Sequence, residues 1–197
     1  MAFKAEYLPG ATELDPEEFL GLISKTISNQ SELQLLESQN ILLAQRWITQ
    51  TKRDVLDEAF ARRLHQKMFG DVWSWAGSYR AAVKNFGALP KDIATKINTL
   101  LSDTNHWIRS KSYSWPQILA MFHYHLVKIQ PYANGNARYA RLYTEALAQT
   151  YQQKIPTWGE SLSGELHLHT PRRSQYIQAL KQADDKKISA LIEFLYL

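Results

Sequence analysis

The sequence predicts an all-α fold, a bundle of helices interrupted by one small β-hairpin. Apolar residues recur at helical spacing over most of the 197 positions, and strand-like alternation is confined to a short stretch near residues 79–83. Hydrophobic residues make up 45% and charged residues 21% of the chain, an ordinary globular composition. With no internal repeat and no low-complexity linker, we expect a single domain over residues 1–197.

Each helix is predicted from its apolar spacing and its start and stop signals. The segment DPEEFLGLISKTI opens with Asp15 as an N-cap and Pro16 at the first helical position. Gly70 ends the segment DEAFARRLHQKMF, and the aromatic segment that follows it suggests a hairpin or extended flap. The predicted helices cover residues 15–27, 31–48, 57–69, 91–109, 115–129, 137–153, 171–183 and 186–196.

Charge and cysteine content exclude several classes of protein. The 23 basic and 19 acidic residues are scattered, so we do not expect nucleic-acid binding, which needs a basic stripe on one face. The chain has no cysteine, which excludes disulfides, thiolate nucleophiles and cysteine-ligated metals. We read no signal peptide at the start and no apolar stretch long enough to span a membrane, and we therefore expect a cytoplasmic protein.

The segment QPYANGNARYAR, residues 130–141, looks like a turn that runs into a helix. Pro131 blocks continuation of the preceding helix, and Asn134 and Gly135 tolerate unusual turn dihedrals. Asn136 is well suited to N-cap the helix that we expect to begin near Ala137.

This turn has the features of an anion site. A helix start presents backbone N–H groups without intrahelical partners, together with partial positive charge. Arg138 and Arg141 are three residues apart, hence on neighbouring positions of one face, where they would hold phosphate oxygens. These residues alone leave a second interpretation open, a structural turn whose arginines face solvent.

The same segment resembles the signature of Fic proteins, His-x-Phe-x-Asp/Glu-Gly-Asn-Gly-Arg-x-x-Arg. The chain is most similar to the Fic subgroup called mobile mystery protein B. The stretches that carry this resemblance are ISNQSELQLLESQNI, LHQKMFGDVWSWAGSYRAAVKNFG, FHYHLVKIQPYANGNARYARL, TWG and YIQALKQAD. The resemblance implies N-terminal helices over residues 1–50, a Fic core over 51–155 and C-terminal helices over 156–197.

Fic enzymes transfer AMP from ATP to a hydroxyl group of a target protein, and this chain departs from their motif at four positions. One departure is mild, since Tyr132 replaces the motif phenylalanine and still fills a core position. The family histidine, which takes the hydroxyl proton, falls on Gln130, whose amide has no useful basicity. The acidic Mg²⁺ ligand falls on Asn134, a weaker ligand. Ala137 replaces the second glycine, so its methyl group can clash with a phosphate or forbid a positive φ.

Four motif positions are retained. The resemblance implies a phosphate cradle made by Gly135, Asn136, Arg138 and Arg141, with ATP as its ligand and a weakened Mg²⁺ site. Our leading hypothesis is therefore a nucleotide-binding pseudoenzyme with little or no AMP transfer. Two alternatives stay open: an active nucleotidyl or phosphate-moiety transferase with an altered mechanism, and a regulatory toxin–antitoxin-type interaction protein.

The resemblance also implies a flap and an inhibitory helix. In Fic proteins the short hairpin before the motif helix clamps a protein target by strand addition, and the matching residues are Lys84, Asn85, Phe86 and Gly87. The inhibitory motif, Ser/Thr-x-x-x-Glu-Gly/Asn, places a glutamate on the second motif arginine. Ser28 and Glu32 have this spacing, although Leu33 departs from the pattern. The alternative is an ordinary helix start in which Ser28 or Asn29 caps and Glu32 is favoured by the dipole.

Overall fold

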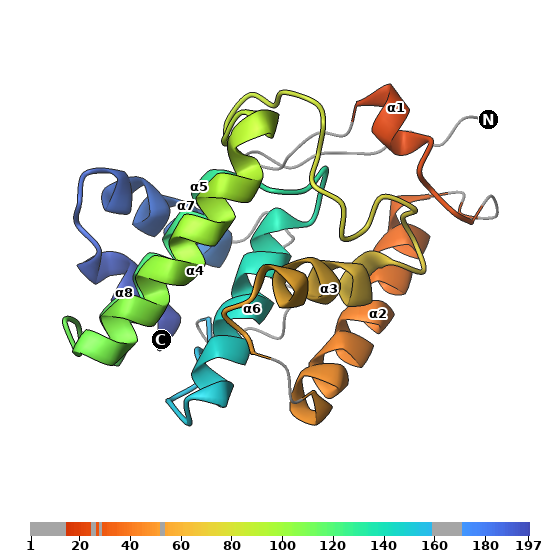
Figure 1. The fold of residues 1–197 in the computed structure, drawn as a ribbon. Helices are drawn as coiled ribbons and strands as arrows, with labels where there is room; N and C mark the ends of the chain where they lie inside the picture. The colour runs from red at the N-terminus through yellow and green to blue at the C-terminus, as the bar shows by residue number, and fades with distance from the viewer. Residues whose placement is uncertain (1–14, 25–26, 28, 52–53, 159–170) are drawn as a thin grey trace.

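The computed structural model describes residues 15–24, 27, 29–51, 54–158 and 171–197, and helices joined by irregular loops make up this part of the chain, in agreement with the predicted all-α class (Figure 1). The helices, in chain order, are α1 (Pro16–Phe19), α2 (Gln30–Gln50), α3 (Glu58–Phe69), the 3₁₀ turn η1 (Pro90–Asp92), α4 (Ile93–Ser110), α5 (Trp115–Ile129), α6 (Asn136–Thr150), α7 (Pro171–Asp184) and α8 (Ser189–Leu195). Within these ranges, none of the helices is both long and apolar enough to cross a lipid bilayer.

Helix α6 lies at the centre of the packing. It contacts α5 on one side and α3 on the other, while α4 and α8 pack on α5 and α2 packs on α3 (Figure 1). Aromatic rings join these layers, since Tyr143 of α6 lies between Phe60 of α3 and Phe122 of α5. All three rings are fully buried, so α6 and the turn before it are held from both sides.

The first predicted helix begins as expected but is much shorter. Asp15 caps α1 and Pro16 is its first residue, and the amide of Asp15 donates to the Glu18 carboxylate over 2.9 Å. The helix ends at Phe19 instead of continuing to residue 27. Beyond it, Leu22 forms an isolated antiparallel bridge with Trp73. Pairing with a distant segment therefore replaces the helical bonds that the local spacing suggests.

The predicted β-hairpin flap is wrong, because the described residues contain no strand beyond the bridge of Leu22 with Trp73. The segment 79–89 is an irregular loop organised around Arg80. The guanidinium group of Arg80 donates to the carbonyls of Gln130 (2.7 Å), Ala82 (2.7 Å) and Ala88 (2.5 Å). Backbone carbonyls that would accept cross-strand hydrogen bonds in a hairpin thus accept from the guanidinium group of Arg80 instead.

Candidate functional site

The motif turn joins the end of α5 to the start of α6. Gln130, the residue after α5, adopts a left-handed conformation with φ 51° and ψ 62°, which turns the chain sharply before Pro131. The amide of Gln130 still donates to the Leu126 carbonyl over 3.3 Å. The turn is therefore fixed at its first residue by the helix that precedes it.

The side chain of Gln130 is buried and faces back toward α5. Only 3% of the residue is exposed, and its Nε2 donates to the Val127 carbonyl over 2.8 Å. Gly87 of the loop 79–89 lies directly against it, because a Cβ built on Gly87 would sit 2.8 Å from Cβ of Gln130. The position of the family histidine therefore holds a neutral amide wedged between helix and loop.

The start of α6 differs by one residue from the sequence prediction. Gly135 is the N-cap and Asn136 is already helical. Asn136 does not cap, because its side chain binds the turn instead: Nδ2 donates to the Tyr132 carbonyl (2.8 Å) and Oδ1 accepts from the Tyr132 amide (2.9 Å). Position 135 requires glycine, because φ is 76° and a Cβ atom there would lie 2.5 Å from the ring of Phe69.

The substitutions at Asn134 and Ala137 have modest structural effects. Asn134 Oδ1 accepts from the Gly135 amide (2.5 Å) and from Arg138 Nη2 (3.4 Å), so the carboxamide faces the start of α6. Ala137 lies inside α6 with helical geometry, so the positive φ considered from the motif is not required there. The amides of the first turn, from Asn136 to Arg138, have no partner within the helix and can bind an anion.

Arg138 is held by an acidic residue that the motif did not reveal. Its Nη1 lies 2.5 Å from Glu37 Oε2 of α2, and its guanidinium group lies over the Phe69 ring at 4.8 Å. Glu37 also accepts from Trp73 Nε1 over 2.8 Å. The sequence does carry a signal for Glu37, an acidic residue four positions after the buried Leu33 on the inner face of a helix.

Arg141 lies deeper and contacts a different helix. It is buried, and its guanidinium group lies 6.0 Å from the ring centre of Tyr176 on α7. Burial lowers the pKa of Arg141, and the positive charge of Arg138 lowers that pKa further. The Tyr176 hydroxyl lies 2.8 Å from Nε2 of His123, a histidine of α5. The two motif arginines are thus close enough to interact but are positioned by helices on opposite sides.

A buried histidine that the sequence did not single out supports the turn. His65 of α3 stacks on Tyr132 with ring centres 3.6 Å apart. The Gly77 amide donates to Nδ1 over 3.0 Å, so Nε2 carries the proton and donates to the Asn134 carbonyl over 3.2 Å. Burial lowers the pKa of His65 to about 3, with a further contribution from the charge of Arg138, so the ring is neutral.

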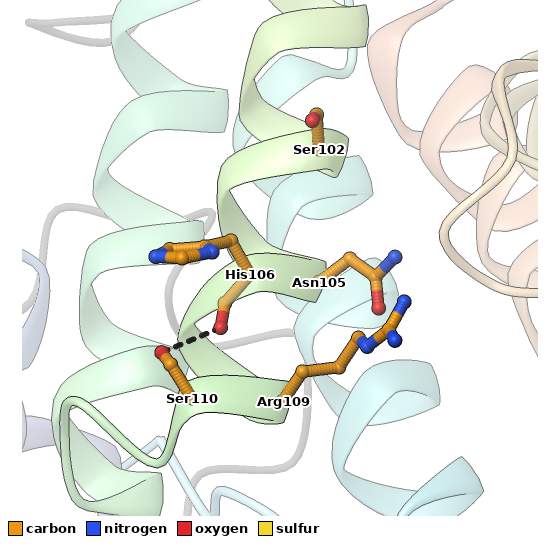
Figure 2. A pocket seen from close by; sticks show the side chains of 5 residues that line it. All are labelled: Ser102, Asn105, His106, Arg109 and Ser110. Carbon is orange, nitrogen blue, oxygen red and sulfur yellow. Dashed lines mark hydrogen bonds between the residues drawn. The ribbon is translucent and has the colours of Figure 1, made fainter.

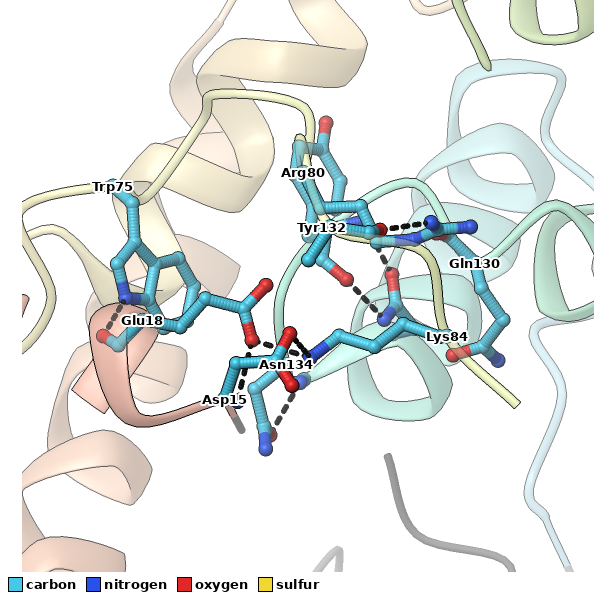
Figure 3. Close-up of polar contacts among 11 residues, drawn as sticks. Asp15, Glu18, Trp75, Arg80, Lys84, Gln130, Tyr132 and Asn134 are labelled. Carbon is cyan, nitrogen blue, oxygen red and sulfur yellow. Dashed lines mark hydrogen bonds and ion pairs between the residues drawn. The ribbon is translucent and has the colours of Figure 1, made fainter. Parts of the chain in front are cut away.

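The predicted flap residues are spread over one side of the turn. Figure 3 shows Lys84 pointing at Asp15, 3.1 Å away, and it also forms an ion pair with Glu18. Gly87 faces Gln130, while the aromatic side chain of Phe86 is exposed. Asn85 is exposed as well. Part of the flap is therefore held by α1 and by the motif turn, and part is accessible.

The predicted inhibitory pair is only partly described. Ser28 lies outside the described residues, and Asn29 caps α2, accepting from the amide of Glu32 over 3.0 Å. Glu32 lies in the first turn of α2. The pairing of Glu32 with Arg141 stays a prediction, whereas Glu37 is an α2 glutamate that contacts a motif arginine, Arg138.

No cluster of metal-binding side chains accompanies these residues in the part of the chain that the structure describes. Within it, no group of three or more histidine and acidic side chains could hold a metal ion. A shallow polar hollow lies on α4 and shares no residue with the motif (Figure 2). It is lined by Ser102, Asn105, His106, Arg109 and Ser110.

Comparison with known proteins agrees with this geometry. Residues 55–148 match the sequence model of the Fic/DOC family, a range that contains α3, the loop 79–89 and most of the motif helix. This segment is therefore similar to Fic/DOC family domains. No curated protein sequence matches the chain.

Solved Fic domains share the fold well beyond that segment. BepC from Bartonella tribocorum, solved with bound AMPPNP, is similar with a TM-score of 0.68 and 15% identity, over 92% of this chain and 96% of that one. The N-terminal Fic domain of a Bep effector from Bartonella quintana, solved with ADP, gives 0.67 and 14%, over 90% and 93%. A Fic-domain signalling protein from Bacteroides thetaiotaomicron gives 0.62 and 18%, over 83% and 66%. The architecture is therefore that of Fic domains.

Proposed function

We propose that this Fic domain binds a nucleotide through its polyphosphate and has little or no capacity for AMP transfer. The observation that carries the proposal is Gln130, whose side-chain amide occupies the position of the family base and donates to the Val127 carbonyl. An amide cannot accept the proton of an attacking hydroxyl at neutral pH, and loss of a general base removes roughly 10²–10⁴ in rate.

The binding half of the proposal rests on the start of α6. Its first-turn amides point out of the helix end, and Arg138 extends from the same turn. Together they supply backbone donors and one guanidinium group for phosphate oxygens. The ADP and AMPPNP found in the Bartonella domains make a nucleotide the ligand of choice for the test.

The residues present fit a polyphosphate better than they fit a metal ion. Asn134 would be the only motif side chain toward Mg²⁺, and its Oδ1 accepts from the Gly135 amide and Arg138. A neutral carboxamide is a weak ligand for Mg²⁺, which would depend mainly on phosphate oxygens and water. The metal would supply charge neutralisation of the phosphates, while this chain's own residues orient them.

The glutamate on α2 sets the strength of binding. Glu37 forms an ion pair with Arg138, so a phosphate must compete with a carboxylate for that guanidinium group. We infer that Glu37, rather than Glu32, is the α2 residue that weakens nucleotide binding. The affinity of the wild-type protein should accordingly be modest.

A protein partner on the flap belongs to the same proposal. The loop 79–89 exposes the apolar residues Val83, Phe86 and Leu89, and Gly87 of the same loop lies against Gln130, so we propose that an extended peptide binds here. Such a partner would be a regulator or a former target. Phe86→Ser should weaken its capture without changing nucleotide affinity, and an unchanged capture would exclude this surface.

Two measurements test the nucleotide proposal. Calorimetric titration with ATP and Mg²⁺ should show binding that Arg138→Ala abolishes, and incubation with labelled ATP and lysate should leave proteins unlabelled. Gln130→His combined with Ala137→Gly should restore self-modification by AMP, with Ala137→Gly alone as the control. Labelling by the wild-type protein would instead identify an active transferase. Absence of ATP binding would favour an interaction protein.

A further inference from the structure

The outer face of α2 carries exposed leucines. Leu35, Leu36, Leu42 and Leu43 are 60%, 37%, 58% and 55% exposed, although the same helix buries its other face against the core. Figure 1 shows α2 along one edge of the molecule, with α3 and α6 on one side of it. Four leucines gathered on one exposed helix face indicate a binding surface, since scattered single apolar residues need no explanation but clusters do.

The leucines are arranged symmetrically about Gln39. Leu35 and Leu43 lie four residues before and after it, and Leu36 and Leu42 lie three before and after. At about 100° per residue, all five residues fall within an arc of about 120° centred on Gln39. When a second α2 lies antiparallel on this face, with Gln39 on the two-fold axis, Leu35 faces Leu42 of the other copy and Leu36 faces Leu43.

The charges at the ends of the stripe have the same symmetry. Glu32 lies seven residues before Gln39 and Arg46 seven residues after it, and both are exposed on the same arc. In the antiparallel arrangement each Glu32 faces Arg46 of the other copy, so the interface gains two opposite-charge contacts. A parallel arrangement would place like charges opposite each other.

We propose that this face of α2 binds a second copy of the same chain, making an antiparallel two-fold homodimer. The partner is identified by complementarity, because a surface that matches itself under a two-fold rotation is what an isologous interface requires. A membrane surface fits less well, since Arg46 is the one basic residue of α2. The proposal concerns the outer face of α2 and goes beyond the nucleotide site, which involves Glu37 on the inner face.

Sedimentation velocity of the full chain over a concentration series tests the dimer. The wild-type protein should change from monomer to dimer as concentration rises. Leu35→Glu with Leu42→Glu should weaken association at least tenfold, whereas Gln34→Glu, exposed on the same helix outside the stripe, should not. Circular dichroism checks that the exposed substitutions leave the fold intact. A wild-type chain that stays monomeric, or a dimer indifferent to the leucine substitutions, overturns the proposal.

Charge reversal tests the orientation of the two helices. Glu32→Arg alone and Arg46→Glu alone should each weaken the dimer, because each places like charges opposite each other. The double reversal should restore it. The two residues are fourteen positions apart, about 21 Å along the helix, so they cannot pair within one chain and rescue must come from the second copy. Failure of the double variant to recover would exclude the antiparallel register.

Cross-linking tests the position of the axis. The chain has no cysteine, so a single introduced thiol reports without background. Under mild oxidation Gln39→Cys should give a disulfide-linked dimer, since the residue on the axis meets its own counterpart. Gln34→Cys should not form this disulfide, because Gln34 lies outside the stripe. Equal cross-linking of both variants would show that the disulfides form in random encounters between molecules, and it would refute the proposed axis.

Discussion

Replacing Glu37 with glutamine should tighten ATP binding. The carboxylate lies 2.5 Å from Arg138 Nη1, and the two side chains are only 6% and 16% exposed, so solvent screens the pair weakly. Glu37→Gln removes the negative charge that competes with phosphate for this guanidinium group. The glutamine side chain can still accept from Trp73 Nε1, so the buried indole keeps a partner.

The size of the effect follows from the interaction that is released. A hydrogen bond to a charged group contributes about 1.5–3 kcal/mol, and tenfold in affinity corresponds to about 1.4 kcal/mol. In the wild-type protein, Arg138 must leave the Glu37 carboxylate to bind a phosphate oxygen, so the loss of one charged hydrogen bond offsets most of the gain from the other. In Glu37→Gln, Arg138 gives up no carboxylate when it binds the phosphate, so the full gain adds to binding. The dissociation constant for ATP should therefore fall by roughly tenfold to a hundredfold.

Isothermal titration of wild-type protein, Glu37→Gln and Glu32→Gln with ATP and Mg²⁺ provides the assay. Glu32→Gln is the matched control, the same substitution on the same helix at an exposed position. It should leave the affinity unchanged. Equal affinities for wild type and Glu37→Gln, or tighter binding by Glu32→Gln, would refute the assignment of Glu37.

Three further predictions concern the supports of the site. Arg80→Ala should lower the free energy of unfolding by about 3 kcal/mol in urea titrations, because three carbonyls lose a charged donor. His65 and His123 have a pKa of about 3 in the folded protein against 6.5 for the free side chain. The unfolded chain therefore binds protons first as pH falls. Between pH 6.5 and about 3, the free energy of unfolding should drop by about 1.4 kcal/mol per pH unit for each histidine, and a pH-independent value would contradict this. Gly135→Ala should lower the free energy of unfolding by about 1–3 kcal/mol, because φ is positive at this position and the new Cβ atom would contact the ring of Phe69.

Helix positions were predicted well where the signals are local. The predicted helix over residues 115–129 coincides with α5, whose start is fixed by Ser114 and Gln117 bonding within one turn. The predicted helix over 15–27 was too long, because a bridge to Trp73 replaces helical bonds after residue 19. The hairpin failed for the same reason, since Arg80 supplies the partners that cross-strand pairing would have supplied.

The candidate site likewise combines features that local sequence predicts with contacts that only the packing of distant segments creates. Local sequence preferences predict the turn with Gly135 at its bend, the amide at Gln130 and a helix start whose first amides have no partner within the helix, because these depend on dihedral preferences and on bonds between near neighbours. Only the tertiary structure decided that Glu37 holds Arg138, 101 residues away, and that His65 fixes the carbonyl of Asn134, 69 residues away. A buried charge or imidazole must find a partner wherever packing brings one, and residue spacing along the chain does not specify which distant group that will be.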